Sequence, residues 1–270
     1  MATKNYIPYA QLDAASVKFM LGTDRIGKTT ITMTYGPQNQ EVALVSSPAV
    51  TMWPRCSGDG NYGTMWGPTD VSKAKYTLDL TDYAINDAPN EEFNAFRKKL
   101  EEVDDALLHF VTDNQLKVLG RRNLSTEEVK MLQIRSVRPK YDKLSGALNG
   151  HTLNCSTAKF RYDGMGGKMA FTPIVCDMRG ATIPNGHVSP GDIVAATIYA
   201  NLVYTGVGGD KFGIHWGFTD VSVICQRTNV PVKLEVEAFK NADWSFGRDY
   251  VDLSEPIGDT YNATDQFGSS

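Results

Sequence analysis

The sequence is poor in cysteine and histidine and has no long apolar run, and each shortage excludes a class of protein. No apolar stretch reaches the roughly 20 residues of a membrane-spanning helix. The first residues, MATKNYIPYAQLD, lack the regions of a signal peptide. The cysteines are scattered, with no CxxC pair and no histidine at ligand spacing, so we expect reduced core residues in an intracellular protein, without a disulfide framework or zinc site. They are Cys56, Cys155, Cys176 and Cys225.

The sequence also lacks the common catalytic signatures. It contains no G-x-S-x-G nucleophile elbow and no H-E-x-x-H motif. Its four histidines lie far apart, at His109, His151, His187 and His215. We therefore expect a protein that is not an enzyme and that uses neither a metal nor a cofactor.

One string matches a phosphate-binding loop. Residues 22–29, GTDRIGKT, fit the pattern G-x-x-x-x-G-K-[ST], in which backbone N–H groups and the lysine hold phosphates and a helix follows. The next residues here, TITMTY, alternate with β-branched side chains and favour a strand. We interpret the match as the turn of a β-hairpin, with a nucleotide hydrolase that uses Lys28 as the alternative.

Charge is distributed unevenly, although the net charge of the chain is only −4. Residues 241–270 hold six acidic residues and one arginine, a net charge of −5. Residues 129–240 hold thirteen basic and eight acidic residues, a net charge of +5. A basic body with an acidic tail suits a protein whose body binds an anionic partner, and chance variation along a long chain is the other explanation.

The most informative segment, residues 189–227, predicts two long strands joined by a glycine-rich turn. In the first strand, alternate residues over 194–204 are apolar or aromatic, which places one face on a core. In the second strand the apolar positions change parity, so we expect a β-bulge near residues 219–220. A long, bulged hairpin of this kind suits a small curved barrel.

This segment resembles the closing hairpin of a known family. A P-G-D turn, an apolar strand, a glycine turn and the string F-G-I-x-W-G-F-x-D-V-x-V-I are similar to OB-fold single-stranded DNA-binding proteins of tailed phages and large nucleocytoplasmic DNA viruses. The remainder of the chain matches only in the order of its elements. The resemblance implies an acidic C-terminal tail that occupies the DNA groove and contacts replication proteins. Asp265-Gln266-Phe267 is similar to the end of such a tail, but three residues follow it and acidic residues are sparse.

A helical insertion interrupts the predicted strands. Residues 90–118 carry apolar side chains at three- and four-residue steps, with Asn90 as N-cap. Ser125 and Glu128 predict a capping box at the start of a second helix, which ends near residue 134. We therefore predict a mainly β chain, with an OB-like Greek-key barrel in residues 1–240, a helical insertion at 90–136 and an acidic, partly flexible tail at 241–270.

The candidate nucleic-acid-binding residues are aromatic or basic and lie in loops or on strand faces. A long loop at residues 46–76 interleaves tryptophans with basic residues. Tryptophan rings can stack on nucleobases and basic side chains can bind phosphates, although the tryptophans could equally anchor the loop to the core. The extended segment 135–143, RSVRPKYDK, places bases around a tyrosine, and a solvated connector is its alternative explanation. The candidates are Trp53, Arg55, Trp66, Lys73, Arg138, Lys140, Tyr141, Lys159, Arg161, Tyr199 and Trp216.

These features together predict sequence-independent binding of single-stranded DNA in replication, recombination or repair. If the protein is viral, it would act at the replication site of the host cell, in the nucleus or a cytoplasmic factory. A viral structural protein, such as a minor capsid component built from a β-sandwich, is the second hypothesis, and the nucleotide hydrolase is the third. The oligomeric state and the preference between DNA and RNA stay open at this stage.

Overall fold

The computed structural model describes ten stretches of the chain, and strands dominate them. The stretches are residues 6–24, 27–52, 54–57, 75–85, 88–158, 160–162, 168–170, 173–183, 188–205 and 211–225. The predicted tail at 241–270 lies outside these residues, so it stays a prediction. Among the described helices, none is both long and apolar enough to cross a membrane.

Five strands pair in a closed circuit. In chain order they are β6 (Ala49–Val50), β8 (Lys75–Thr81), β11 (Leu148–Ala158), β15 (Ile193–Thr205) and β16 (Phe212–Cys225). Their pairing runs β6, β8, β11, β16, β15 and back to β6, and only the β11–β16 contact is parallel. The order first, second, third, fifth, fourth is that of the Greek-key OB-fold barrel. The predicted OB-like barrel is confirmed, and the described strands do not form the sandwich expected of a capsid protein.

The β15–β16 ribbon is long and bulged, as predicted. Thr197 pairs with Asp220, but Ile198 pairs with Phe218, so Thr219 is an extra residue on β16. This bulge keeps Phe218 and Val221 inside the barrel, although they are an odd number of residues apart. Two further register shifts bend the ribbon and let it form both neighbouring walls of the barrel.

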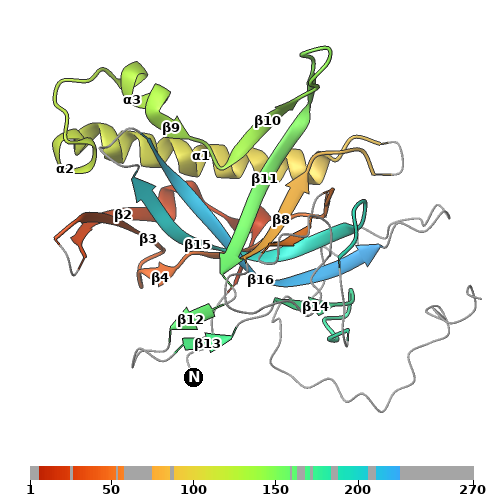
Figure 1. Cartoon of the computed structure of the whole chain (residues 1–270). Coiled ribbons are helices and arrows are strands. Elements are labelled where there is room, and N and C mark those ends of the chain that lie inside the picture. Colours follow the sequence, from red (N-terminus) through yellow and green to blue (C-terminus); the bar gives the residue numbers. More distant parts are fainter. Residues whose placement is uncertain are drawn as a thin grey trace, which may run out of the picture.

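The remaining strands extend the sheet, except that β12 and β13 form a separate two-stranded sheet. They are β1 (Ile7–Pro8), β2 (Val17–Thr23), β3 (Thr29–Tyr35), β4 (Gln40–Glu41), β5 (Ala43–Val45), β7 (Arg55–Ser57), β9 (Gln133–Ile134), β10 (Val137–Tyr141), β12 (Phe160–Tyr162), β13 (Lys168–Ala170) and β14 (Ile174–Cys176), and two short 3-10 helices lie at Tyr9–Gln11 and Ala14–Ser16. Antiparallel β10 and β11 form a hairpin that stands out from the barrel (Figure 1).

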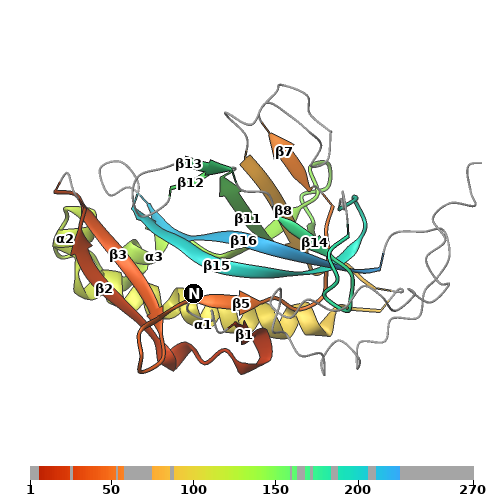
Figure 2. The same cartoon turned by 90° about the horizontal axis from the view of Figure 1, so that it is seen from below.

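Three helices lie between β8 and β9: α1 (Glu91–Asp113), α2 (Gln115–Leu119) and α3 (Thr126–Leu132). The side chain of Asn90 accepts a hydrogen bond from the Phe93 N–H, and Ser125 with Glu128 forms the predicted capping box. The apolar stripe of α1 belongs to the same core cluster as the barrel interior. Figure 2 shows α1 along one side of the β15–β16 ribbon, with β8 and β11 on the other.

The single helix predicted for residues 90–118 is broken in the structure. At Asn114 the backbone leaves the helical region, with φ −118° and ψ 27°, and its side-chain amide donates to the Phe110 carbonyl. An asparagine side chain competes in this way with the backbone bonds that would continue a helix. The apolar periodicity of residues 90–118 therefore predicted the buried face of the helix correctly but did not predict the break at Asn114.

Candidate nucleic-acid interface

A pocket of about 470 Å³ opens where β8, β10, β11 and β16 meet. Along β8 and β11, Leu78, Leu153 and Cys155 are buried in the core, so the residues between them face outward. The polar and basic residues that line the pocket include Thr77, Arg138, Lys140, Asn154, Ser156 and His215. The pocket thus lies on the outer surface of the barrel, and its lining combines these polar and basic groups with apolar surface.

The basic side of the pocket comes from β10. Arg138 and Lys140 are two residues apart on this strand and both line the pocket. The Lys140 ammonium also lies 5.3 Å from the centre of the Tyr83 ring, a distance at which a cation is attracted to the face of an aromatic ring. Pro139 between them has no N–H, which suits its place on a strand at the edge of the sheet. These two cations are the described groups best placed to bind a phosphate.

Hydroxyl and imidazole groups lie deeper in the pocket. Ser156 Oγ and His215 Nε2 are 2.6 Å apart, and this hydrogen bond joins β11 to β16. Thr152 also lines the pocket, and its buried hydroxyl has no hydrogen-bond partner among the described residues. Donors and acceptors are therefore available to a ligand that enters between the strands.

A buried carboxylate that also lines the pocket, that of Asp79, is used within the fold. Its Oδ1 accepts hydrogen bonds from the Thr51 hydroxyl at 2.9 Å and from the Met52 N–H at 3.2 Å. Asp79 thereby fixes Thr51 and Met52, the two residues that directly follow β6. Because this negative charge lines the pocket, an anion in the pocket would lie beside the two cations of β10 and away from Asp79.

Two tyrosines of β15 lie over glycines of β16. Tyr199 is opposite Gly217, where an added Cβ would come within 2.4 Å of the tyrosine Cζ, and its hydroxyl lies 3.1 Å from the hydroxyl of Thr157. Tyr204 is opposite Gly213, and burial raises the pKa of Tyr204, an effect that nearby Arg138 opposes. Glycine thus leaves room for each aromatic ring across the strand pair.

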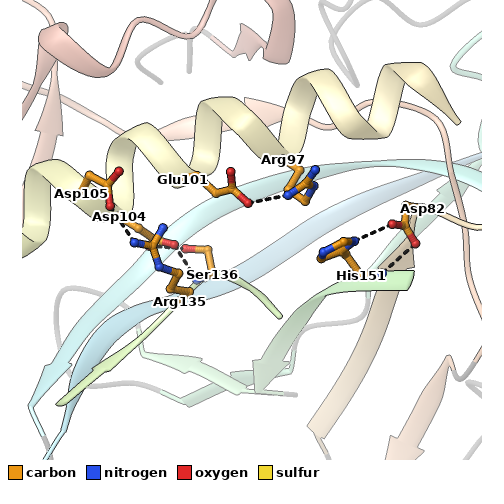
Figure 3. A network of polar contacts seen from close by, with 8 residues as sticks. All are labelled: Asp82, Arg97, Glu101, Asp104, Asp105, Arg135, Ser136 and His151. Atoms are coloured by element: carbon orange, nitrogen blue, oxygen red, sulfur yellow. Dashed lines mark hydrogen bonds and ion pairs between the residues drawn. The ribbon is translucent and has the colours of Figure 1, made fainter. Parts of the chain in front are cut away.

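A buried network holds β10 against α1 (Figure 3). Asp104 is fully buried and accepts hydrogen bonds from the Ser136 N–H and hydroxyl, each at 2.8 Å. The Ser136 oxygen in turn accepts from the indole N–H of Trp216 at 2.8 Å. Arg135, beside Ser136, pairs with Asp105 on α1 at 2.8 Å. The strand that carries Arg138 and Lys140 is therefore fixed at its start from both the core and the surface.

A second contact in Figure 3 fixes the base of the β10–β11 hairpin. The Asp82 carboxylate lies 2.8 Å from His151 Nδ1 and accepts from the His151 N–H at 2.7 Å. Gly150 precedes this residue with a φ of +101°, and a Cβ there would lie 2.4 Å from Asp82 Oδ1. The end of β8 is therefore tied to β11 just where the hairpin leaves the barrel.

Among the predicted site residues, the structure brings Arg138 and Lys140 together in the pocket and places the other described ones on several elements. Arg138 and Lys140 line the pocket, Tyr141 follows them at the end of β10, and Tyr199 lies across Gly217. Arg55 pairs with pocket residue Thr77 through the backbone, and Arg161 lies in β12. Four predicted residues lie outside the described residues: Trp53, Trp66, Lys73 and Lys159.

The assignment of Trp216 to the interface needs correction. Its side chain is 1% exposed and donates to Ser136, so it belongs to the core and cannot stack on a base. The pocket also contains short polar residues that were not predicted as site residues, Asn154 and Ser156 on β11 and His215 on β16. The alternation of Leu153 and Cys155 with these polar residues was the signal that could have found them.

The string at residues 22–29 is the turn of a β-hairpin, as interpreted from the sequence. β2 pairs with β3 up to Thr23 opposite Thr29, so a strand follows the turn. The Lys28 N–H is bonded to the Asp24 carboxylate at 2.8 Å and the Gly27 N–H to the Asp24 carbonyl at 3.1 Å. These N–H groups are therefore already bonded within the turn. Within the described part of the chain, no cluster of three or more His, Cys, Asp or Glu residues could hold a metal ion.

Comparisons with known proteins found distant structural similarity. No family model matches the chain, and no curated protein matches its sequence. The chain is similar to gp2.5, a single-stranded DNA-binding protein encoded by bacteriophage T7, with a TM-score of 0.46 and 10% identity over 69% of this chain and 93% of that one. It is also similar to a single-stranded DNA-binding protein from bacteriophage Enc34 in complex with ssDNA, with a TM-score of 0.35 and 11% identity over 80% of this chain and 99% of that one.

Proposed function

We propose that this chain binds single-stranded DNA without sequence preference, and that it does so in replication, recombination or repair. The observation that carries the proposal is the pocket on the face of β8 and β11, where the basic residues Arg138 and Lys140 lie beside polar and apolar groups. These are the second and third strands of the barrel, and that face is where OB-folds bind oligonucleotides. The acidic segment 241–270 would contact replication proteins, a proposal supported by its net charge of −5.

Binding would rest on phosphate neutralisation and on contact with unpaired bases. Arg138 and Lys140 would replace the counterions condensed on phosphates, a contribution that does not depend on base identity. A pocket of about 470 Å³ has the size of a small-ligand site, so it admits one unstacked nucleotide more readily than a base pair within a duplex. The hydroxyl and imidazole groups around Ser156 would bond to the sugar or to base edges without a fixed pattern.

A titration with labelled oligo-dT at several salt concentrations tests the proposal. Tight binding that weakens as salt rises is expected for the wild-type protein, and absence of binding at low salt would contradict the proposal. In the double variant Arg138→Ala/Lys140→Ala, the slope of log K against log salt should fall by about 1.4, because each contact to a single-strand phosphate contributes about 0.7.

The matched control is Lys117→Ala/Arg122→Ala, which removes the same two charges from exposed positions in and after α2. Its salt slope should stay at the wild-type value. Equal slopes for the two double variants would show that the cations of β10 are not the phosphate contacts.

A further inference from the structure

The tip of the β10–β11 hairpin, residues 141–148, exposes three large apolar side chains. Tyr141 is 61% exposed, Leu144 98% and Leu148 56%. Tyr141 and Leu148 are directly opposite in the strand register, so their side chains share one face of the hairpin. Figure 1 shows this hairpin standing out from the body of the molecule. A gathering of exposed apolar side chains on a protruding element is typical of a binding surface.

The tip is ordered by its own hydrogen bonds. The Asp142 carboxylate accepts from the N–H groups of Leu144 at 3.0 Å and Ser145 at 2.7 Å, and from the Ser145 hydroxyl at 2.9 Å. The Asp142 N–H donates to the Ala147 carbonyl at 2.8 Å, and Gly146 adopts the positive φ that closes the turn. The N–H of Ser145 lowers the pKa of the Asp142 carboxyl, so this carboxylate stays ionised and bonded to the turn. A preordered surface loses little conformational entropy when it binds.

Charge and position indicate what the tip contacts. The same strand carries Arg138 and Lys140 at the pocket, and exposed Lys143 lies in the tip itself. The acid of the tip, Asp142, is engaged in the turn. Apolar side chains flanked by cations match unpaired nucleic acid, whose bases have apolar faces and whose phosphates are anionic.

We infer that the hairpin tip is a second contact for the same single strand, in which bases beyond the pocket lie against Tyr141, Leu144 and Leu148. This inference rests on the proposed function. Tyr141 is three residues from Arg138, about 10 Å along a strand, and successive phosphates in one DNA strand are about 3.4 Å apart along the helix axis. A strand held at Arg138 therefore reaches the tip within about three nucleotides.

Oligonucleotides of two lengths separate the pocket from the tip. The wild-type protein should bind dT of about 12 nucleotides more tightly than dT of about 2, because only the longer strand spans the roughly three nucleotides between Arg138 and the tip. The variant Tyr141→Ser/Leu144→Ser/Leu148→Ser should bind the short oligonucleotide like the wild type and should lose about tenfold in affinity for the long one. Abasic residues at the end of the long strand that meets the tip should weaken wild-type binding and leave the variant unchanged.

Leu116→Ser/Met131→Ser is the matched control, because these apolar side chains are 48% and 83% exposed on the helices. It should bind both lengths like the wild type. If the triple variant does not fold by circular dichroism, Leu144→Ser alone replaces it, since that side chain is almost fully exposed.

The outcomes distinguish this inference from the proposed function. If the wild-type protein binds neither oligonucleotide, the proposed function fails. If it binds both and the triple variant retains the full advantage of the long strand, the tip inference is overturned. Light scattering that shows a wild-type dimer and a monomeric triple variant would also overturn it, because the tip would then be a contact between two copies.

Discussion

Among single residues, Asp104 is the buried ionisable group that connects α1 to the core. It is fully buried, and burial raises the pKa of its carboxyl to about 6, partly offset by its hydrogen bonds to Ser136. The same serine accepts from Trp216 in the core. The α1 helix, β10 and the barrel interior therefore meet at one ionisable group.

The pH dependence of stability should reveal Asp104. Because its folded-state pKa is above the ordinary value of 3.8, its contribution to the free energy of unfolding is fully present below pH 4 and is lost as pH rises through about 6. The difference in unfolding free energy between the wild type and Asp104→Asn should therefore fall, by up to about 3 kcal/mol, from pH 4 to pH 7. Urea denaturation across this range measures it.

Asp105→Asn is the control for this prediction. Asp105 is adjacent on α1, but its carboxylate is half exposed and pairs with Arg135. Its difference from the wild type should change much less over the same pH range. A difference for Asp104→Asn that does not vary with pH would contradict the pKa assigned to the buried group.

At the scale of elements, the sequence predicted the β15–β16 ribbon and its bulge from alternation alone. It could not predict that Tyr199 lies over Gly217, because that contact depends on the exact register between two strands. It also placed Trp216 at the interface, although Trp216 shares its strand face with Ile214 and Phe218, and this apolar alternation is the pattern of a core face. The helical break at Asn114 was missed because a side-chain bond to Phe110 competes locally with the helix.

The Tyr199–Gly217 contact predicts a specific coupling between the two strands. In Gly217→Ala the new Cβ would collide with the Tyr199 ring, so the ring must leave Thr157 and the protein should lose about 1–3 kcal/mol of stability. In a Tyr199→Ala background the same change should cost much less, because the ring is gone. Thermal and urea unfolding of the four proteins measure this double-mutant cycle.

Gly22→Ala is the matched control, since a Cβ in that strand would meet only the flexible hydroxyl of Thr30 at 3.1 Å. It should change stability much less than Gly217→Ala. Equal costs of Gly217→Ala with and without Tyr199 would show that the ring is not what the glycine accommodates.

At the scale of the whole molecule, the fold class, a closed barrel, could be predicted because long bulged strands suit a curved sheet. The pocket was not, because its lining comes from four strands that are up to about 140 positions apart in the sequence. Only the segment with Arg138 and Lys140 could be proposed from local composition. The uneven charge is a property of the whole chain, and under the proposed function it predicts how fast the chain associates with DNA.

Removing residues 241–270 changes the net charge of the chain from −4 to +1. A chain that ends at residue 240 should therefore associate with oligo-dT faster at low salt, and the gain should disappear at about 0.5 M salt, where charges are screened within a few ångströms. Stopped-flow fluorescence at both salt concentrations measures the rates. The shortened chain should also lose binding to a replication polymerase, if the acidic segment forms that contact.

A gain in rate of equal size at both salt concentrations would show that the segment acts by blocking the site and not through long-range charge. Unchanged polymerase binding would remove the proposed role of the segment in partner contact.

Among the described residues, the barrel closes between β11 and β16 through one backbone register pair, Cys155 and Trp216, beside the Ser156–His215 side-chain bond. This seam is narrow compared with the seven paired residues between β8 and β11. A polynucleotide bound in the pocket would contact both β11 and β16, so it would stabilise the pairing of these two strands. Binding in the pocket and the stability of the closed barrel would then be thermodynamically coupled.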